Sequence, residues 1–360
     1  MAKENMRILF LARRYPPSVG GVQTHCFNLY NRLIEKHHVK LIALGKQSLL
    51  NLAWFVPYTF IASFFQVLFQ RVDAIYFSDG VICCLAPFLR PFTKAKFVVT
   101  IYGLEMTYST PIFSQLMRWG VSVCDKVPVI SEKTRDVSIE AGVPKSKIDI
   151  IYLGIDPPSI SEERRQELKV QFEKEHGIQL GKDRVLLNFG RQVPRKGIAK
   201  FLEHGMPLLD PDIKFIISGS GPDSDRIRQI QKEKGLEDRV LLLWLDNDML
   251  AMLRGEADLF LMPNVPYPND VEGFGIAQLE CMYDGTPAVV FAVDALVESV
   301  RRGGYQIPPN DYQAFVDQIH AFYKLSPEKR ADIEQEAREY VRAEYTWAKT
   351  AEQYFEVFES

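Results

Sequence analysis

Residues 259–292 read LFLMPNVPYPNDVEGFGIAQLECMYDGTPAVVFA. This stretch begins with an apolar run (259–263), passes through an irregular loop into the segment EGFGIAQLE (272–280), and ends with a second apolar run (288–292). Short apolar runs on either side of a helical segment are typical of a β-α-β unit with two parallel strands. The stretch therefore predicts a parallel sheet that is covered by helices.

The same alternation extends in both directions along the chain. Further strand-like runs lie at 184–190, 214–221 and 239–245, and an earlier series lies at 7–12, 40–45, 74–78, 96–102, 126–130 and 149–153. Helical patterns fall between or after them, at 21–36, 57–70, 111–123 and 161–176. Two such series predict an α/β protein of two doubly wound Rossmann-like domains, with ligands at the carboxyl ends of the strands in a cleft between the domains.

The chain length supports two domains, because a typical domain has about 150 residues and this chain has 360. The predicted boundaries are an N-terminal Rossmann-like domain at 1–155, a linker with a helix at 156–182, a C-terminal Rossmann-like domain at 183–343 and a final helix at 344–360. The final helix is expected to pack back on the first domain.

The composition is that of a globular protein, with 47% hydrophobic and 25% charged residues, which excludes a disordered or collagen-like chain. The net charge of −3 hides an asymmetry. Residues 1–155 hold 18 Lys and Arg against 10 Asp and Glu, whereas the remaining 205 residues hold 25 against 36. A basic half is therefore joined to an acidic half.

The cysteines and the N-terminus indicate a reducing, cytoplasmic setting. The five cysteines form no CxxC pair, and the six histidines do not stand at zinc-binding spacings relative to them. Neither a disulfide framework nor a metal site is expected from this pattern. The start of the chain enters Arg13-Arg14 after a short apolar run, which is typical of a first strand and not of a signal peptide.

Residues 47–70 carry no charge and are long enough to cross a bilayer. Pro57 is expected in the first turn of a helix, with Phe60, Phe64 and Leu68 among the apolar residues of one face and Thr59 and Ser63 among the small or polar residues of the other. We expect this one-sided helix to be buried in the first domain. Shallow membrane contact and a true span are the alternatives.

The segment 272–280 carries the strongest chemical signal. Gly273 and Gly275 free the backbone where the helix starts, so that the amides of Gly275, Ile276 and Ala277 can form an anion site. The carboxylates of Glu272 and Glu280 suit sugar hydroxyls, because a carboxylate accepts hydrogen bonds from neighbouring O–H donors. Two ordinary surface glutamates are the alternative.

Three further segments follow strand ends. Arg191 and Lys196 in GRQVPRKG (190–197) could both reach a diphosphate, although solvated surface cations are the alternative and the segment is no Walker loop. The paired glycines of GGVQTH (20–25) permit close approach to a phosphate or sugar, whereas His25 taken alone is better explained as a structural residue. Gly219 in SGSGP is by itself only a turn signal.

Taken together, these motifs resemble those of the retaining glycosyltransferases of the GT-B fold, in the group-1 family, which is also called family four. The resemblance covers nearly the whole chain: GGVQTH, SEKTRD, GVPKSKIDIIYLGID, GRQVPRKG, SGSGPD, ADLFLMP, EGFGIAQLE and DGTPAVV occur in family-like order. It implies transfer of a sugar from a nucleotide-diphosphate sugar to a glycan, glycolipid or lipid-linked acceptor, with retained anomeric configuration and without a cofactor or metal ion.

The resemblance also implies roles for individual residues. Arg191 and Lys196 would bind the diphosphate, Glu280 the ribose and Glu272 the hydroxyls of the donor sugar, with Glu272, Arg191 and Lys196 as the catalytic set. The expected donor site also includes Gly20, Gly21, Gly190, Gly219, Phe274, Gly275, Ile276, Ala277 and Tyr102. His25 and Glu105 are expected on the acceptor side.

The chain departs from the family pattern at several positions. Tyr102 stands where the family often has a histidine that contacts the donor sugar, and Asp294-Ala295 replaces a Gly-Gly pair. Trp244 replaces a glycine at a strand end that is expected to lie near the nucleotide base of the donor. The identity of that base, uracil, guanine or adenine, is therefore left open. An epimerase or hydrolase acting on a nucleotide sugar, or a non-catalytic binding protein, remains an alternative function.

The basic half is the one expected to receive the acceptor. Since Lys and Arg near an anionic surface each contribute about 1 kcal/mol, we expect this half to contact acidic membrane reversibly, on the inner face of the cell membrane. An unoriented scatter of surface charge is the alternative. Nucleic acid is not an expected partner, because no cluster of basic and aromatic residues is present in the sequence.

Overall fold

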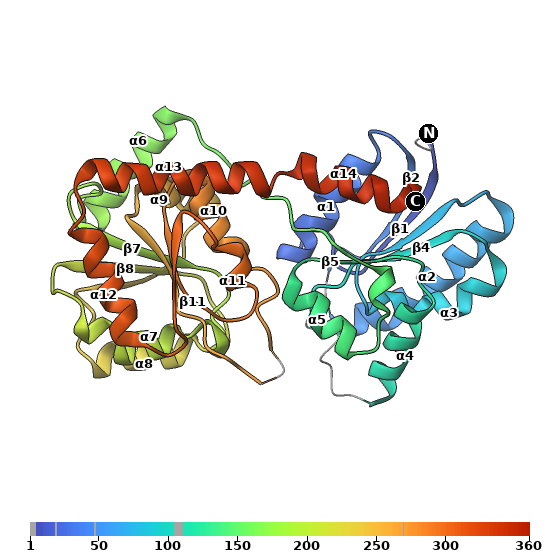
Figure 1. Cartoon of the computed structure of the whole chain (residues 1–360), viewed down its shortest axis with the longest axis horizontal. Helices are drawn as coiled ribbons and strands as arrows, with labels where there is room; N and C mark the ends of the chain where they lie inside the picture. The colour runs from blue at the N-terminus through green and yellow to red at the C-terminus, as the bar shows by residue number, and fades with distance from the viewer. Residues whose placement is uncertain (1–4, 19, 47, 104–110, 269) are drawn as a thin grey trace. The chain divides into compact units, whose positions relative to one another are not determined.

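The computed structural model describes residues 5–18, 20–46, 48–103, 111–268 and 270–360. The chain forms two compact units (Figure 1). Unit 1 comprises Met1–Gly154 together with Tyr345–Ser360, and unit 2 comprises Ile155–Glu344. Since the last 16 residues fold with unit 1, that unit holds 19 Lys and Arg against 13 Asp and Glu, and unit 2 holds 24 against 33.

Unit 1 is built on a parallel sheet in the order β2-β1-β3-β4. Its strands are β1 (Arg7–Ala12), β2 (His38–Ala43), β3 (Ala74–Phe77) and β4 (Lys96–Val99). A two-stranded sheet of β5 (Val127–Val129) and β6 (Ile148–Ile150) continues beside it through a parallel bridge between Ile101 and Val129. The alternation predicted from the apolar runs is present, with each strand within a few residues of the predicted run.

The two faces of this sheet are covered by different helices. On one face, α1 (Gly21–Leu33) and α14 (Trp347–Glu359) pack side by side (Figure 1) and share a core that includes Phe10, Leu29 and Phe355. The other face packs against α2 (Leu49–Phe69), α3 (Ala86–Leu89) and α4 (Pro111–Ser122), which contribute Phe55, Leu89 and Val121 to a second core. The C-terminal helix is therefore part of unit 1, although it follows unit 2 in the sequence.

A buried chain of hydrogen bonds ties α14 to the sheet. The hydroxyl groups of Tyr76 and Tyr354 each lie 2.7 Å from Thr100 Oγ1, and the Tyr354 hydroxyl also lies 3.2 Å from His25 Nε2. Burial lowers the pKa of His25 to about 3, so its imidazole is neutral at physiological pH. The ring also packs beside Trp347, with 5.5 Å between the ring centroids.

Removing the hydroxyl at the centre of this chain should destabilise unit 1. Tyr354→Phe removes a hydrogen-bond partner from both Thr100 and His25, which are buried, and is expected to lower the free energy of unfolding by about 1–3 kcal/mol. Urea unfolding followed by circular dichroism measures the change. The matched control is Tyr58→Phe, whose ring is 53% exposed on α2. Equal effects of the two substitutions would contradict the structural role of these buried hydrogen bonds.

The prediction for residues 47–70 is wrong in three respects. The helix α2 begins at Leu49, where Ser48 Oγ accepts a hydrogen bond from Asn51 N (3.0 Å), and Pro57 lies inside it. Thr59 and Ser63 face the core. Of the apolar residues predicted to be buried, Phe60 and Phe64 are only partly buried, and Ile61, Phe65, Leu68 and Phe69 are exposed. Since nearly every residue of α2 is apolar, hydrophobicity does not select the buried face, and small side chains allow closer packing on the neighbouring segments.

Among the described residues, α2 is also the one helix long and apolar enough to cross a membrane by length and composition. An 18-residue window within Leu50–Phe69 has a mean hydropathy of 1.6, and only 17% of that window is buried. The expectation of a buried core helix therefore does not hold.

Unit 2 contains a six-stranded parallel sheet in the order β12-β11-β10-β7-β8-β9. Its strands are β7 (Arg184–Phe189), β8 (Ile213–Ser218), β9 (Val240–Leu243), β10 (Leu259–Met262), β11 (Ala288–Phe291) and β12 (Gly304–Ile307). The last strand is not predicted by the sequence, because GYQI carries too little apolar character to form a recognisable run.

Helices cover both faces of this sheet (Figure 1). One face packs against α7 (Ile198–His204), α8 (Ser224–Glu233) and α12 (Tyr312–Tyr323), and the other lies under α9 (Asn247–Glu256), α10 (Ile276–Asp284) and α13 (Pro327–Glu344). The strand order reverses between β7 and β10, the first and fourth strands of the unit. At such a reversal the loops leaving the two strands run in opposite directions and open a crevice at the carboxyl edge.

Candidate functional site

At this reversal, the loops that leave β7 and β10 contact each other close to the ends of the strands. Between the loops, Val265 N donates to Arg195 O (2.9 Å). Between the strands themselves, Asn188 Nδ2 of β7 donates to Leu261 O of β10 (2.8 Å). Gly197 has φ of 69°, and a Cβ at this position would lie 1.9 Å from Pro263 O. Only glycine fits here, because a side chain would separate the two loops.

This contact brings Glu272 to two cations of the other loop. The Oε2 atom of Glu272 accepts hydrogen bonds from Lys196 Nζ (2.6 Å), from Asn264 Nδ2 (2.9 Å) and from the Arg195 guanidinium. The Glu272 side chain is almost fully buried. A buried carboxylate with three donors on one oxygen is held in place, and two adjacent cations outnumber its single charge.

Burial alone would raise the pKa of the Glu272 carboxyl, but Lys196 and Arg195 outweigh it and lower the pKa to about 2. Burial lowers the pKa of Lys196, and the charges of Arg195 and Arg191 add to that effect, while Glu272 opposes it. We assign Lys196 and Glu272 as an ion pair at neutral pH because a hydrogen bond of 2.6 Å joins them.

Two further acidic residues position this cluster. Arg195 Nε donates to Asp270 Oδ1 (2.9 Å), so its guanidinium is held by Asp270 and Glu272 together. Asp294 Oδ2 accepts from the backbone N–H of Glu272 (3.1 Å). Asp294 has φ of 50°, a left-handed conformation that favours glycine. Asp294 thus combines a backbone conformation typical of glycine with a side-chain hydrogen bond to Glu272.

Arg191 differs from Lys196 in its surroundings. It is exposed, yet it lies near enough to Lys196 for its charge to lower the pKa of that lysine. The two predicted diphosphate ligands, Arg191 and Lys196, therefore lie close enough for their charges to interact. Lys196 belongs to the Glu272 cluster, whereas Arg191 faces solvent.

The helix α10 begins at Ile276, after Gly275 with φ of 80°. Ile276 and Ala277 are partly exposed in its first turn, while Phe274 is buried. Because the first N–H groups of a helix have no partner inside it, this end can bind an anion. It follows Glu272 by four residues.

Glu280 lies on the second turn of α10 and is partly buried. Desolvation raises the pKa of its carboxyl to about 7, with Asp284 adding to the effect and Arg254 opposing it. Glu272 and Glu280 therefore differ in ionisation although they belong to one motif. Glu272 is ionised at every physiological pH, whereas Glu280 titrates near pH 7.

Replacing Glu280 by glutamine should stabilise the protein in a pH-dependent way. The folded pKa lies above the ordinary value of 4.5, so ionisation of Glu280 costs stability as the pH rises through about 7. Glu280→Gln is expected to raise the free energy of unfolding by about 1–2 kcal/mol at pH 8 relative to the native chain, and by much less at about pH 5. Urea unfolding at both pH values measures this. An equal gain at both would contradict the assignment.

The glycines Gly190 and Gly219 form the neighbouring part of the edge. Both have φ near 130°, and a Cβ on Gly219 would lie 2.1 Å from Gly190 O. Beyond them, at the carboxyl ends of β8 and β9, lies a cavity of about 180 Å³ whose lining includes Gln192, Gly219, Arg228, Leu243 and Trp244. The Trp244 side chain is 78% exposed at its rim.

The remaining predicted residues belong to unit 1. Gly21 is the first residue of α1, and Gly20 precedes it. Tyr102 follows β4, and its ring lies 5.7 Å from the His25 ring. Burial raises the pKa of Tyr102 well above its ordinary value. Glu105 lies outside the described residues.

The structure does not support the acceptor-side role predicted for His25. Only 2% of the residue is exposed, and Nε2 is used by Tyr354. The reason is that α14 returns to α1 and covers this position, which the sequence around His25 does not reveal.

Sequence reasoning missed Arg195, Asn264 and Asp294 as members of the Glu272 cluster. Arg195 stands beside Lys196 in the segment GRQVPRKG, where the sequence does not distinguish which cation contacts Glu272. Asn264 lies two residues after the end of β10, and Asp294 lies three residues after the end of β11. Polar residues that follow adjacent parallel strands converge on one edge, and this rule could have found them.

Comparison with known proteins assigns the chain to a family. The family model for glycosyltransferase family 4 matches residues 19–158, and the model for glycosyl transferases group 1 matches residues 170–340. The chain is a glycosyltransferase of the group-1 family with the GT-B fold. The predictions of the family, the fold class and the enzyme class are thereby confirmed.

Relatives extend over most of the chain. The uncharacterized glycosyltransferase MJ1607 of Methanocaldococcus jannaschii is 24% identical over 98% of both chains. The N-acetyl-alpha-D-glucosaminyl L-malate synthase of Bacillus anthracis is 27% identical over 74% of this chain and 68% of its own length. Among solved structures, HepE of Anabaena in complex with UDP and glucose superposes with a TM-score of 0.79 at 19% identity, covering 99% of this chain and 100% of HepE.

Proposed function

We propose that this glycosyltransferase moves a sugar from a nucleotide-diphosphate sugar to a glycan, glycolipid or lipid-linked acceptor. The observation that carries the proposal is the cluster of Lys196, Arg195 and Glu272 at the strand-order reversal of unit 2. Fixed cations beside a buried carboxylate suit a ligand that joins a diphosphate to a sugar. The relatives support the donor class, since HepE binds UDP and glucose, and a Mycolicibacterium smegmatis relative is named a GDP-mannose-dependent mannosyltransferase.

The donor would lie along the carboxyl edge of unit 2. Lys196, Arg191 and the first turn of α10 would bind the diphosphate, and Glu280 would accept from the ribose hydroxyls. The base would occupy the cavity beside Trp244. The three donors to Glu272 act on Oε2, so Oε1 is the oxygen we assign to a sugar hydroxyl.

The proposed reaction retains the anomeric configuration and needs no metal ion. The bond from the anomeric carbon to the β-phosphate oxygen breaks, and its electron pair remains on the nucleoside diphosphate. The acceptor oxygen bonds to the same carbon, and its proton is taken up by the released diphosphate. Lys196, Arg191 and the amides of α10 would stabilise the developing negative charge in advance of reaction.

We place the acceptor in unit 1 and the enzyme in the cytoplasm. Unit 1 carries the surplus of cations, which suits acceptors bearing phosphate. The cysteines Cys26, Cys83, Cys84, Cys124 and Cys281 are buried free thiols, which is compatible with a reducing compartment.

A thermal-shift screen with UDP-, GDP- and ADP-sugars tests the donor assignment. A ligand that binds the folded state raises the melting temperature, so one nucleotide series should raise it and the others should not. With that donor, product should form only when a glycan or glycolipid acceptor is present, and equally in EDTA and in Mg²⁺. Turnover of the donor without acceptor would instead favour hydrolysis or epimerisation, and a requirement for Mg²⁺ would refute metal independence.

A further inference from the structure

One side of α2 is a continuous apolar surface. Its large exposed side chains follow the helical repeat along the whole helix, and they are Leu50, Trp54, Tyr58, Ile61, Phe65, Leu68 and Phe69. Phe69 is 77% exposed, and no residue of α2 carries a charge. We call this surface the α2 face. Exposed apolar surface of this extent is uncommon in a monomeric protein unless something binds it.

Aromatic residues of neighbouring helices widen the α2 face. The Phe64 ring packs at 4.9 Å from the Phe92 ring, which is about half exposed. The rings of Phe88 and Trp119, on α3 and α4, lie 5.5 Å apart and are also about half exposed. The contacts of Phe64 with Phe92 and of Phe60 with Phe88 (6.4 Å between ring centroids) fix the helix on unit 1, so the exposed rings belong to a firmly packed surface.

The α2 helix is tied at both ends to one sheet. The strand before it, β2, and the strand after it, β3, both pair with β1 in parallel. A helix that crossed a bilayer would separate these strands by the membrane thickness, about 30 Å. Contact with a membrane must therefore be made with α2 lying in the interface.

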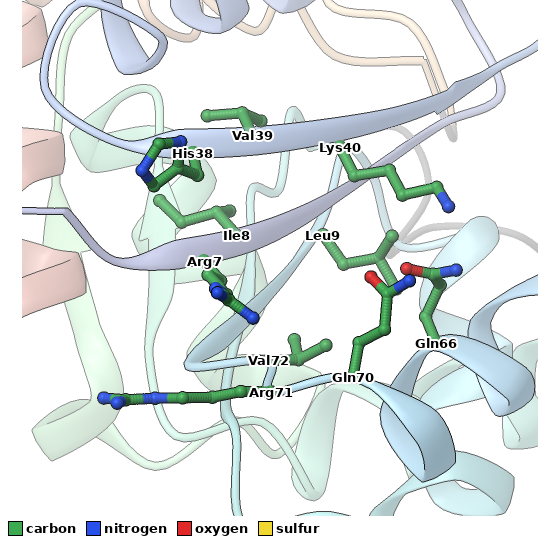
Figure 2. Close-up of a pocket in the computed structure, with 10 residues that line it drawn as sticks. All are labelled: Arg7, Ile8, Leu9, His38, Val39, Lys40, Gln66, Gln70, Arg71 and Val72. Atoms are coloured by element: carbon green, nitrogen blue, oxygen red, sulfur yellow. The ribbon is translucent and has the colours of Figure 1, made fainter.

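A cationic cavity opens at the C-terminal end of α2 (Figure 2). Its volume is about 380 Å³, and its polar lining is Arg7, His38, Lys40, Gln66, Gln70 and Arg71. Figure 2 shows the Gln66 and Gln70 amides rising from the helix end toward Leu9 and Lys40 of the strands. The cavity is thus built by the C-terminal end of α2, beside Phe69 of the α2 face, and by the first residues of β1 and β2.

The charge of this cavity is positive on balance. Arg71 Nε pairs with Asp73 Oδ1 at 2.9 Å, and Asp73 Oδ2 also accepts from the backbone N–H of Arg7. One carboxylate therefore stands against the side chains of Arg7, Lys40 and Arg71. All three are exposed, as is His38, whose imidazole adds two polar nitrogens.

We infer that the α2 face docks on an anionic phospholipid bilayer, with a lipid phosphate group bound in the cationic cavity. Tryptophan, tyrosine and phenylalanine along an interfacial helix enter the boundary between head groups and acyl chains, and cations at its border attract acidic lipid. The cavity lies at the amino ends of β1 and β2, the edge opposite to Gly20 and Tyr102. Docking would therefore leave the carboxyl edge of the sheet open.

A second copy of the chain is the competing occupant. A two-fold contact through the α2 face would offer no negative charge to either cationic cavity, because both copies present the same residues, and where the two helices ran parallel the like charges of the cavities would repel. An acidic bilayer offers the opposite charge to the same residues. Charge complementarity therefore favours lipid over self-association.

Vesicle co-sedimentation of the full chain tests the inference. The native chain should bind vesicles of phosphatidylcholine mixed with phosphatidylglycerol, bind pure phosphatidylcholine much less, and lose affinity at high salt. Phe65→Gln with Phe69→Gln should reduce binding to acidic vesicles by at least about tenfold. The matched control is Val170→Gln, which removes a valine that is 63% exposed on α6 (Glu162–His176) of unit 2 and should leave binding unchanged.

The cavity is tested separately by charge reversal. Lys40→Glu with Arg71→Glu should reduce binding to acidic vesicles by at least about tenfold and hardly affect binding to neutral ones. Lys232→Glu with Lys329→Glu, both exposed in unit 2, changes the net charge equally and should have little effect. Soluble inorganic phosphate should not compete strongly, since the lipid site includes the apolar face.

Three results would overturn the inference. The native chain could ignore acidic vesicles, the α2 variant could bind them as tightly as the native chain, or sedimentation velocity could show a native dimer that the α2 variant converts to monomers. Nucleotide-induced thermal shifts are recorded for every variant. They report on unit 2, so they separate a failure of docking from a failure of the proposed transfer function.

Discussion

Lys196→Ala is expected to lower kcat/KM for sugar transfer by about a thousandfold while the protein remains folded. Lys196 is the partly buried cation that we assign to the departing diphosphate, and its position is already fixed by Glu272 before the reaction begins. Removing it takes away stabilisation of the charge that develops as the glycosidic bond breaks. Water cannot replace it fully, because an entering water carries no charge.

The fold should tolerate this substitution because Glu272 keeps Arg195 and Asn264 as donors. We expect a change of less than about 2 kcal/mol in the free energy of unfolding. Lys200→Ala, four residues further on in α7, is the matched control and should retain full transfer. Initial rates with the donor selected by thermal shift measure the effect. Full activity of the Lys196 variant would remove it from the catalytic set.

Glu272→Ala is expected to abolish transfer and also to destabilise unit 2. It leaves the partly buried Arg195 and Lys196 without their shared counter-charge, with Asp270 still paired to Arg195, which costs about 3 kcal/mol. Loss of the carboxylate would also remove the proposed contact with the donor sugar. Because the two effects coincide, the alanine variant alone cannot assign the role of Glu272.

Glu272→Asp separates the two effects. It keeps the negative charge near the cations but withdraws the carboxylate by one methylene, so stability should recover in part while transfer stays at least about a hundredfold low. Thermal unfolding and initial rates are measured on both variants. If the aspartate variant transfers sugar at the native rate, Glu272 serves only as a structural counter-ion.

The free energy of unfolding measured at low pH gives an independent check that Glu272 is paired with Lys196 and Arg195. Its folded pKa of about 2 lies below the ordinary 4.5, so the stabilisation is present above about pH 4.5 and is lost as the pH falls toward 2. The difference in unfolding free energy between the native chain and Glu272→Gln should therefore shrink on acidification. Glu280→Gln shows the opposite sign, since burial dominates at that carboxyl.

Most of the fold could be predicted because parallel strands buried on both faces read as continuous apolar runs. The runs at 184–190 and 259–263 correspond to β7 and β10, and the helix expected after Gly275 begins at Ile276. The strand β12 was missed, because GYQI has no such run. The α2 helix was misjudged because a helix that is apolar on nearly every side carries no signal for its buried face.

The candidate site could be predicted only in its principal residues. Glu272, Lys196 and Arg191 stand out because their glycine-rich surroundings mark strand ends. Arg195 and Asp294 did not, since their contacts with Glu272 join segments that are 77 and 22 residues apart in the sequence.

The sequence by itself determined the alternation of strands and helices, the family, and the residues that suit a diphosphate and a sugar. These are local properties, because an apolar run or a glycine before a helix acts over a few residues. The tertiary structure decided which cations hold Glu272, why His25 is buried under α14, and which side of α2 faces outward. Those outcomes depend on contacts between distant segments, where packing volume and the desolvation of charge select one arrangement.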